Sequence, residues 1–264
     1  MHFKQNTFGG NYILAGIFIL FLIIGTVSVT SNPNTKGVFN TNAAKKKLPI
    51  YCVETNKKQV SISFDAAWGA DDTDKLLQIL KENNVTATFF LCGYWVDKYP
   101  QEVKKIALAG HDLGNHSDTH PHMSKLSLEQ IKNELMSVHE KVKTLTGINM
   151  HLFRPPFGEY NDNVITASEQ TNYYTIQWDI DSLDWMEKGK DHEINQVLNH
   201  KHLGNGSIIL FHNDAKYTPE VLDTIIKGLI AKGYEIVPIS DLVIEDNFYM
   251  DYEGRQKSNT KNVQ

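Results

Sequence analysis

The amino-acid sequence predicts an α/β protein in which helices alternate with the strands of a parallel sheet. From Gln59 onward, short runs of β-branched and aromatic residues are each followed by a longer amphipathic stretch, which is the pattern of repeated βα units. The chain has 264 residues, of which 41% are hydrophobic, so it can bury one sizeable core. Polar residues stand at the ends of several predicted strands, where parallel α/β enzymes place their chemistry.

The predicted elements follow one another along the chain. The strands are Gln59 to Phe64, Thr86 to Cys92, His151 to Arg154, Tyr174 to Ile180, Ser207 to Phe211 and Glu235 to Pro238. The helices are Asp72 to Asn83, Gln101 to Ala109, Ser127 to Thr146, Asn161 to Thr171, Asp191 to Lys201 and Pro219 to Lys232. Ser127 is suited to an N-cap, and Gly147 and Gly233 lie just past helix ends, where a left-handed cap is expected. No glycine-rich phosphate loop follows the first strand, so a dinucleotide fold loses its main support.

The first 30 residues are predicted to be a membrane anchor or an export signal. Tyr12 to Val29 is an almost unbroken apolar run, long enough to cross a bilayer and preceded by a single lysine, Lys4. Thr26 to Thr30 offers no clear small-x-small cleavage site, which favours an uncleaved anchor. We therefore expect a single-pass membrane protein with an extracytoplasmic domain, or a secreted one if the segment is cleaved.

Three further regions follow the apolar segment. Residues 31–47 are rich in Asn, Thr, Lys and Gly and are predicted to be a flexible linker. Residues 48–245 form the expected catalytic domain. Residues 246–264 are polar, lack apolar periodicity and are expected to be a frayed tail.

Composition narrows the class of partner. The net charge of −5 gives no basic field for gripping nucleic acid, whereas a neutral or zwitterionic glycan fits. The sequence has 2 cysteines, Cys52 and Cys92, which make no disulfide framework and are left unassigned between a bridge and buried thiols. We expect a monomer.

A candidate metal site lies in the segment from Gly114 to His120. His116 and His120 are four residues apart, so both imidazoles can face one cation if the segment is helical or tightly turned. The alternative is a polar loop with no ligand role. What favours a site is a set of polar residues at other strand ends: Asp65, Arg154, Asp181, Asp184 and His212.

Taken in order, these segments resemble the motifs of the polysaccharide deacetylase family, with its NodB-homology domain, also called carbohydrate esterase family 4. The likeness covers about residues 48 to 245 and is strongest to the sporulation-type branch, because of Phe64 to Gly69, Phe89 to Leu91 and Trp95. The resemblance implies an irregular (β/α) barrel of about seven strands. It also implies a deacetylase acting on cell-wall glycan.

The resemblance implies a role for each motif residue. Asp65 would be the general base and His212 the general acid, while a metal on His116 and His120 would activate water. Arg154 could hold Asp65 in a two-pronged hydrogen bond, and Asp184 could hold Arg154 in turn. The backbone N–H of Phe157 would contribute to the oxyanion site, and Trp185 would form a wall beside the acid histidine. The alternatives remain a plain buried ion pair for Arg154 and Asp184, a core aromatic for Trp185 and a structural histidine for His212.

The sequence departs from the family at Ala66. Most active relatives carry a second aspartate there, which serves as a metal ligand. We expect one of three outcomes: Asp71 or Asp72 reaches in, with Asp71 better placed; the metal, most simply zinc, binds weakly through the two histidines and water; or no metal is held.

The function predicted first is an anchored deacetylase that removes N-acetyl groups from peptidoglycan, with the spore cortex suggested by the sporulation-type likeness. The alternative is a glycan-binding or structural wall protein that kept the groove and lost turnover with Ala66. An exported amidase on a small amide is a third reading.

Overall fold

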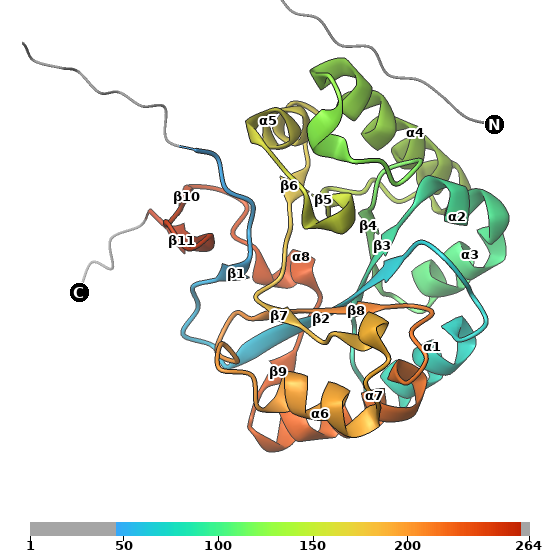
Figure 1. Ribbon diagram of the computed structural model, residues 1–264, viewed down its shortest axis with the longest axis vertical. Helices are drawn as coiled ribbons and strands as arrows, with labels where there is room; N and C mark the ends of the chain where they lie inside the picture. The colour runs from blue at the N-terminus through green and yellow to red at the C-terminus, as the bar shows by residue number, and fades with distance from the viewer. Residues whose placement is uncertain (1–45, 260–264) are drawn as a thin grey trace, which may run out of the picture. The chain divides into compact units, whose positions relative to one another are not determined.

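The structure, a computed structural model, describes residues 46–259 and is built on an eight-stranded, all-parallel sheet (Figure 1). Its strands, in hydrogen-bonded order, are β6 (Tyr174–Thr175), β5 (Leu152–Phe153), β4 (Asp112–Asn115), β3 (Thr88–Leu91), β2 (Gln59–Ala66), β8 (Ile208–His212) and β7 (Ile180–Asp181). The short β9 (Glu235–Ile236) pairs with the start of β2. Among the described residues no ladder joins β6 to β7, so the curled sheet is a barrel left open on one side. The predicted irregular barrel is confirmed.

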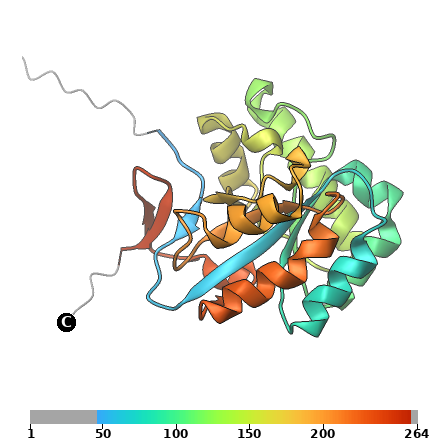
Figure 2. The same cartoon turned by 60° about the horizontal axis from the view of Figure 1, so that its bottom comes forward.

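Helices cover the outside of this sheet (Figure 2). They are α1 (Thr73–Glu82), α2 (Gly93–Lys98), α3 (Pro100–Leu108), α4 (Leu128–Thr146), α5 (Asp162–Gln170), α6 (Lys190–Leu198), α7 (Thr218–Ala231) and α8 (Ile239–Leu242), with 3₁₀ turns η1 (Met123–Lys125), η2 (Pro156–Gly158) and η3 (Asp184–Met186). Ser127 caps α4 in a capping box with Gln130, and Gly147 ends it at φ 77°. The predicted helices all occur within a few residues of their expected ends.

The central strand β2 explains how a core and a site share one sheet. Val60, Ile62 and Phe64 belong to the main hydrophobic cluster together with residues of the outer helices. Ser63 and Asp65 alternate with them and are also buried. Because successive strand side chains point to opposite faces, the apolar residues pack under the helices and the polar ones point into the barrel. The inside of the barrel is therefore the polar side of this strand.

Two predictions about the elements need correction. The run from Tyr174 to Ile180 is divided into β6 and β7, because the chain leaves the sheet between them. The expectation of a frayed C-terminal tail is wrong for most of the segment: β10 (Phe248–Met250) pairs antiparallel with β11 (Arg255–Ser258), which pairs with β1 (Cys52–Val53). Gln256 anchors the hairpin, since its buried side-chain amide donates to and accepts from the backbone of Ile244. The hairpin was not predicted because its segment is polar and shows no apolar periodicity.

The predicted membrane segment, residues 1–30, and nearly all of the predicted linker, 31–47, lie outside the described residues. Within 46–259, no helix combines the length and the apolar character needed to cross a bilayer. Both cysteines, Cys52 and Cys92, are buried free thiols.

Candidate active site

Strand register places two of the predicted catalytic residues side by side. Asp65, near the end of β2, is the register partner of His212, the last residue of β8. On the other side, β2 leads through β3 to β4, which ends at Asn115, and Asn115 pairs with Phe153 of β5. His116 and Arg154 directly follow those two residues. The carboxyl ends of adjacent parallel strands thus gather residues from distant parts of the sequence at one end of the barrel.

Arg154 and Asp65 form a buried ion pair beneath the site. The guanidinium Nη1 donates to Asp65 Oδ1 at 2.8 Å, and Nη2 donates to Ser63 Oγ at 2.8 Å and to the Gln177 carbonyl at 3.3 Å. The predicted two-pronged contact with Asp65 is therefore absent. Burial by itself would raise the pKa of Asp65, but the charge of Arg154, together with that of His212, holds the pKa below its ordinary value. Asp65 is thereby kept ionised.

His116 is buried and held in one orientation by its neighbours. Its Nδ1 lies 2.7 Å from the backbone carbonyl of Arg154, which can only accept, so Nδ1 carries the hydrogen and Nε2 a lone pair. Nε2 lies 3.6 Å from Asp65 Oδ2. Burial lowers the pKa of His116, so the imidazole is neutral. His116 thus presents an uncommitted nitrogen beside the carboxylate.

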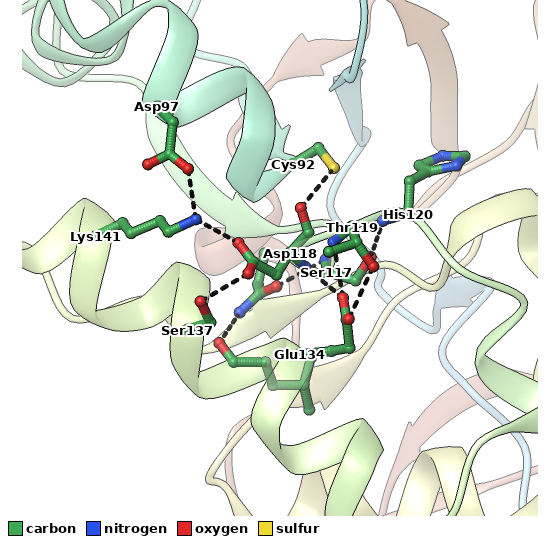
Figure 3. A network of polar contacts seen from close by, with 11 residues as sticks. Cys92, Asp97, Ser117, Asp118, Thr119, His120, Glu134, Ser137 and Lys141 are labelled. Carbon is green, nitrogen blue, oxygen red and sulfur yellow. Dashed lines mark hydrogen bonds and ion pairs between the residues drawn. The ribbon is translucent and has the colours of Figure 1, made fainter.

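The second histidine of the pair sits on a loop that α4 holds in place (Figure 3). Glu134 accepts hydrogen bonds from the backbone N–H of Asp118 at 2.9 Å and of Thr119 at 2.8 Å. Ser117 and His120 both have left-handed backbone, with φ of 64° and 55°, and the Ser117 hydroxyl accepts from the His120 N–H at 3.1 Å. Burial, followed by the neighbouring His116, lowers the pKa of His120 to about 4. Both imidazoles are neutral.

His212 has the opposite electrostatic character. Its Nδ1 donates to Asp184 Oδ1 at 2.8 Å, and its backbone N–H donates to Asp184 Oδ2 at 2.7 Å. Burial by itself would lower the pKa of His212, but the hydrogen bond and charge of Asp184, together with Asp65 and Asp181, raise it to about 9. The prediction that Asp184 holds Arg154 is wrong: Asp184 holds His212, because η3 lies beside the end of β8 and Arg154 lies on the other side of β2.

These groups face one cavity of about 620 Å³. Of the predicted site residues, those lining it are Asp65, His116, His120, Phe157, Asp184, Trp185 and His212. Trp185 is 58% exposed, so it is no core aromatic, and Phe157, 56% exposed, lies between the rings of His120 and His122. Apolar faces on an open cavity suit the stacking of a sugar ring.

The residues present do not fit an ordinary metal site. Ala66, where the family has a ligand, is fully buried in the main hydrophobic cluster. Asp71 lies exposed in the turn before α1 and does not line the cavity, so the structure does not bring the predicted substitute to the site. Over residues 46–259 no group of three or more His, Cys, Asp and Glu side chains could hold a metal ion. Two neutral imidazoles remain, one donor short of the three that protein zinc sites use.

Sequence reasoning missed several residues that shape the site. Ser63 and the Gln177 carbonyl are partners of Arg154, and Thr218 and Glu193 lie behind Asp184. Ser63 could have been predicted from the sequence, because it alternates with Asp65 along β2 and so lies on the same face of the strand. The others come from helices and loops whose side chains meet the site only after folding. Further residues that line the cavity are Trp68, Trp178, Glu187, Asp214 and Lys216, and Asp181, which the sequence had indicated, lines it too.

The fold and the paired acid and base define a hydrolase-like site of the deacetylase class, and comparison with known proteins agrees. Residues 53–176 match the family model for polysaccharide deacetylase. The chain is 33% identical over 222 residues to the peptidoglycan-N-acetylmuramic acid deacetylase PdaA of Bacillus subtilis, covering 83% of this chain and 84% of that protein. It is 34% identical to the peptidoglycan-N-acetylglucosamine deacetylase of Bacillus cereus, over 71% of this chain and 69% of that protein. This chain belongs to the polysaccharide deacetylase family.

One similar structure is described as a pseudoenzyme. The chain superimposes with a TM-score of 0.71, at 35% identity, on a pseudoenzyme of carbohydrate esterase family 4 from Bacillus anthracis, covering 75% of this chain and 69% of that one. A mutant of that pseudoenzyme is described as having restored enzymatic activity. The similar proteins thus include some named as peptidoglycan deacetylases and one described as a pseudoenzyme.

Proposed function

We propose that this protein is an N-deacetylase that hydrolyses acetamido groups of peptidoglycan. The observation that carries the proposal is the pairing of Asp65 with His212 across adjacent strands, one held ionised and the other held protonated, on one cavity. The relatives whose names include peptidoglycan deacetylase support the choice of substrate.

The reaction needs a base on one side of the amide and an acid on the other. Asp65, kept ionised by Arg154, takes a proton from the attacking water, and His212, kept protonated by Asp184, gives one to the departing amine. The backbone N–H of Phe157 faces the oxyanion in this scheme. The rings of Phe157 and Trp185 at the cavity mouth hold the sugar.

A divalent ion is part of the family's chemistry in general, where it activates water and polarises the carbonyl. In this chain His116 and His120 would be its protein ligands, with zinc favoured by imidazole donors. Because the third donor is missing, we propose that any such ion binds weakly, and no step above depends on it.

A second function is favoured by Ala66 and by the likeness to a pseudoenzyme. In this reading the protein binds peptidoglycan in the same cavity without turnover. The exposed rings of Phe157 and Trp185 at the cavity opening would be sufficient for binding glycan.

We further propose that the apolar residues 12–29 hold the domain at the outer face of the cell membrane, next to its substrate. Support comes from the sequence pattern alone. The sporulation-type motifs add the spore cortex as a candidate location for the substrate.

The test is acetate release from peptidoglycan by the full-length protein, with and without added zinc, cobalt, manganese or nickel. Release that disappears in Asp65→Asn supports the deacetylase. Binding to peptidoglycan without acetate release under every metal supports the second function. Release of amine without acetate would mean a different amide substrate.

A further inference from the structure

Behind the acid histidine, a chain of hydrogen bonds runs from the cavity into the interface between α6 and α7. His212 Nδ1 donates to Asp184, and the hydroxyl of Thr218, the first residue of α7, lies 3.1 Å from Asp184 Oδ2. The same hydroxyl lies 2.8 Å from Glu193 Oε1 on α6. Thr218 is fully buried and Glu193 is 2% exposed. A second carboxyl group is thus joined to the Asp184–His212 pair through one hydroxyl.

The hydroxyl of Thr218 has a single hydrogen and cannot donate to both carboxyl groups at once. If Glu193 is ionised, the hydroxyl donates to Glu193 and leaves Asp184. If Glu193 carries a proton, it donates to the hydroxyl oxygen, which then donates to Asp184. The direction in which the Thr218 hydroxyl donates its hydrogen bond therefore depends on whether Glu193 is protonated.

The surroundings of Glu193 make both states accessible. Its Oε2 is buried and has no hydrogen-bond partner among the described residues, which disfavours the anion. Burial, helped by the charge of Asp184, raises the pKa of Glu193 to about 7 although Thr218 opposes the shift. The charged groups facing this chain of hydrogen bonds are Asp184 from η3 and two carboxylates that act on His212, Asp65 from β2 and Asp181 from β7.

We propose that Glu193 is a positioning residue that acts through Thr218 to control how firmly His212 holds its proton. A neutral Glu193 lets Thr218 donate to Asp184, which weakens the hold of Asp184 on the His212 proton. An ionised Glu193 withdraws that hydrogen bond and adds a negative charge, so His212 becomes a weaker acid. Glu193 thereby tunes the acid of the reaction.

This inference rests on the proposed function for the role of His212 as an acid. Its test measures the titration of His212 directly and does not require turnover. Imidazole NMR resonances of the full-length protein are followed from pH 5 to pH 10, and the His212 signal is the one missing in His212→Gln. In the natural protein the signal should change mainly near pH 9, with a smaller step near pH 7 as Glu193 ionises. Absence of the smaller step overturns the proposal without any variant.

Substitutions at Glu193 and Thr218 test whether Glu193 acts on His212 through the Thr218 hydroxyl. Glu193→Gln should remove the step near pH 7 and lower the midpoint of His212 by about 0.5 pH unit, since the buried anion is gone. Thr218→Val should shrink the step, whereas Thr218→Ser should keep it. Glu220→Gln, which removes an exposed carboxylate from the first turn of α7, is the matched control and should change nothing. The proposal fails if Glu193→Gln leaves His212 unchanged or if Glu220→Gln shifts it equally. Loss of acetate release in the natural protein would not alter this readout.

Discussion

The two sides of the cavity differ in how completely they are built. On the acid side, His212, Asp184, Thr218 and Glu193 form an unbroken line of hydrogen bonds from the cavity to the α6–α7 interface. On the histidine side, His116 and His120 are oriented and neutral, yet no third donor joins them within the part of the chain that the structure describes. One small residue in β2 accounts for the difference. In this fold the residues that transfer protons can therefore be complete while the set of metal ligands is not.

Asp65 belongs to both sides, because it lies next to His212 in register and next to His116 in space. Its counter-charge comes from a third direction, from Arg154 after β5. Asp65, on which both sides of the cavity depend, is therefore held in place by Arg154, which belongs to neither side.

The largest effect is expected from Asp65→Asn, which disables both sides together. Acetate release should fall by about 10³-fold, because the base is removed at nearly constant shape. The free energy of unfolding should fall by about 3 kcal/mol, since Arg154 stays charged and buried without its partner. Assays below the melting temperature, with circular dichroism as a check on folding, separate the two. Asp74→Asn, an exposed carboxylate on α1, is the control; retained turnover in Asp65→Asn would mean that another residue is the base.

Asp184→Asn tests the acid side alone. The raised pKa of His212 keeps it protonated until the pH rises through about 9, so the rate of the natural protein should fall only above that pH. Without the Asp184 charge the imidazole should lose its proton near or below its ordinary value of about 6.5. The alkaline limb of the rate profile should therefore move down by about 2.5 pH units, with a loss of about 30-fold at pH 8. An alkaline limb that stays near pH 9 would contradict the assigned acid.

Ala66→Asp tests the histidine side. Without metal, the new carboxylate enters an apolar cluster and should lower the melting temperature. With zinc, a third donor should raise affinity at least about tenfold by titration calorimetry and recover the melting temperature through binding to the native state. Ala67→Asp places the same charge one residue later and should gain no affinity. Equal affinity in both variants would mean that the alanine at position 66 is not what limits metal binding.

The smallest effect is expected at the mouth, which both sides share. Trp185→Ala removes a half-exposed ring and should change stability by less than about 0.5 kcal/mol. The KM for glycan should rise about fivefold, from the loss of roughly 1 kcal/mol of ring stacking. Tyr252→Ala, exposed on the β10–β11 connection, is the control. A change in the rate constant rather than in KM would mean that Trp185 acts on the acid histidine.

The sequence predicted those features that depend on local periodicity or on motif order. Alternation along β2 indicated a strand with an apolar face and a carboxylate at its end, and the same logic located the helices and the cap at Ser127. Asp65 and His212 were found because each stands at the end of a predicted strand, and parallel strands end at one edge. His116 and His120 were found because two histidines four residues apart can face one cation. Ala66 was recognisable as a missing ligand only through the resemblance to the family, whose active members carry an aspartate at that place in the motif.

Only the tertiary structure decided which residues are partners. Asp184 holds His212 and not Arg154, Asp71 stays in an exposed turn, and Gln256 fastens a hairpin that looked like a frayed tail. Glu193 and Thr218 meet because α6 packs against α7, the next helix along the chain, which follows β8. Side-chain partnerships of this kind depend on helix packing and strand register, which arise from the whole core and leave no signature in any single segment.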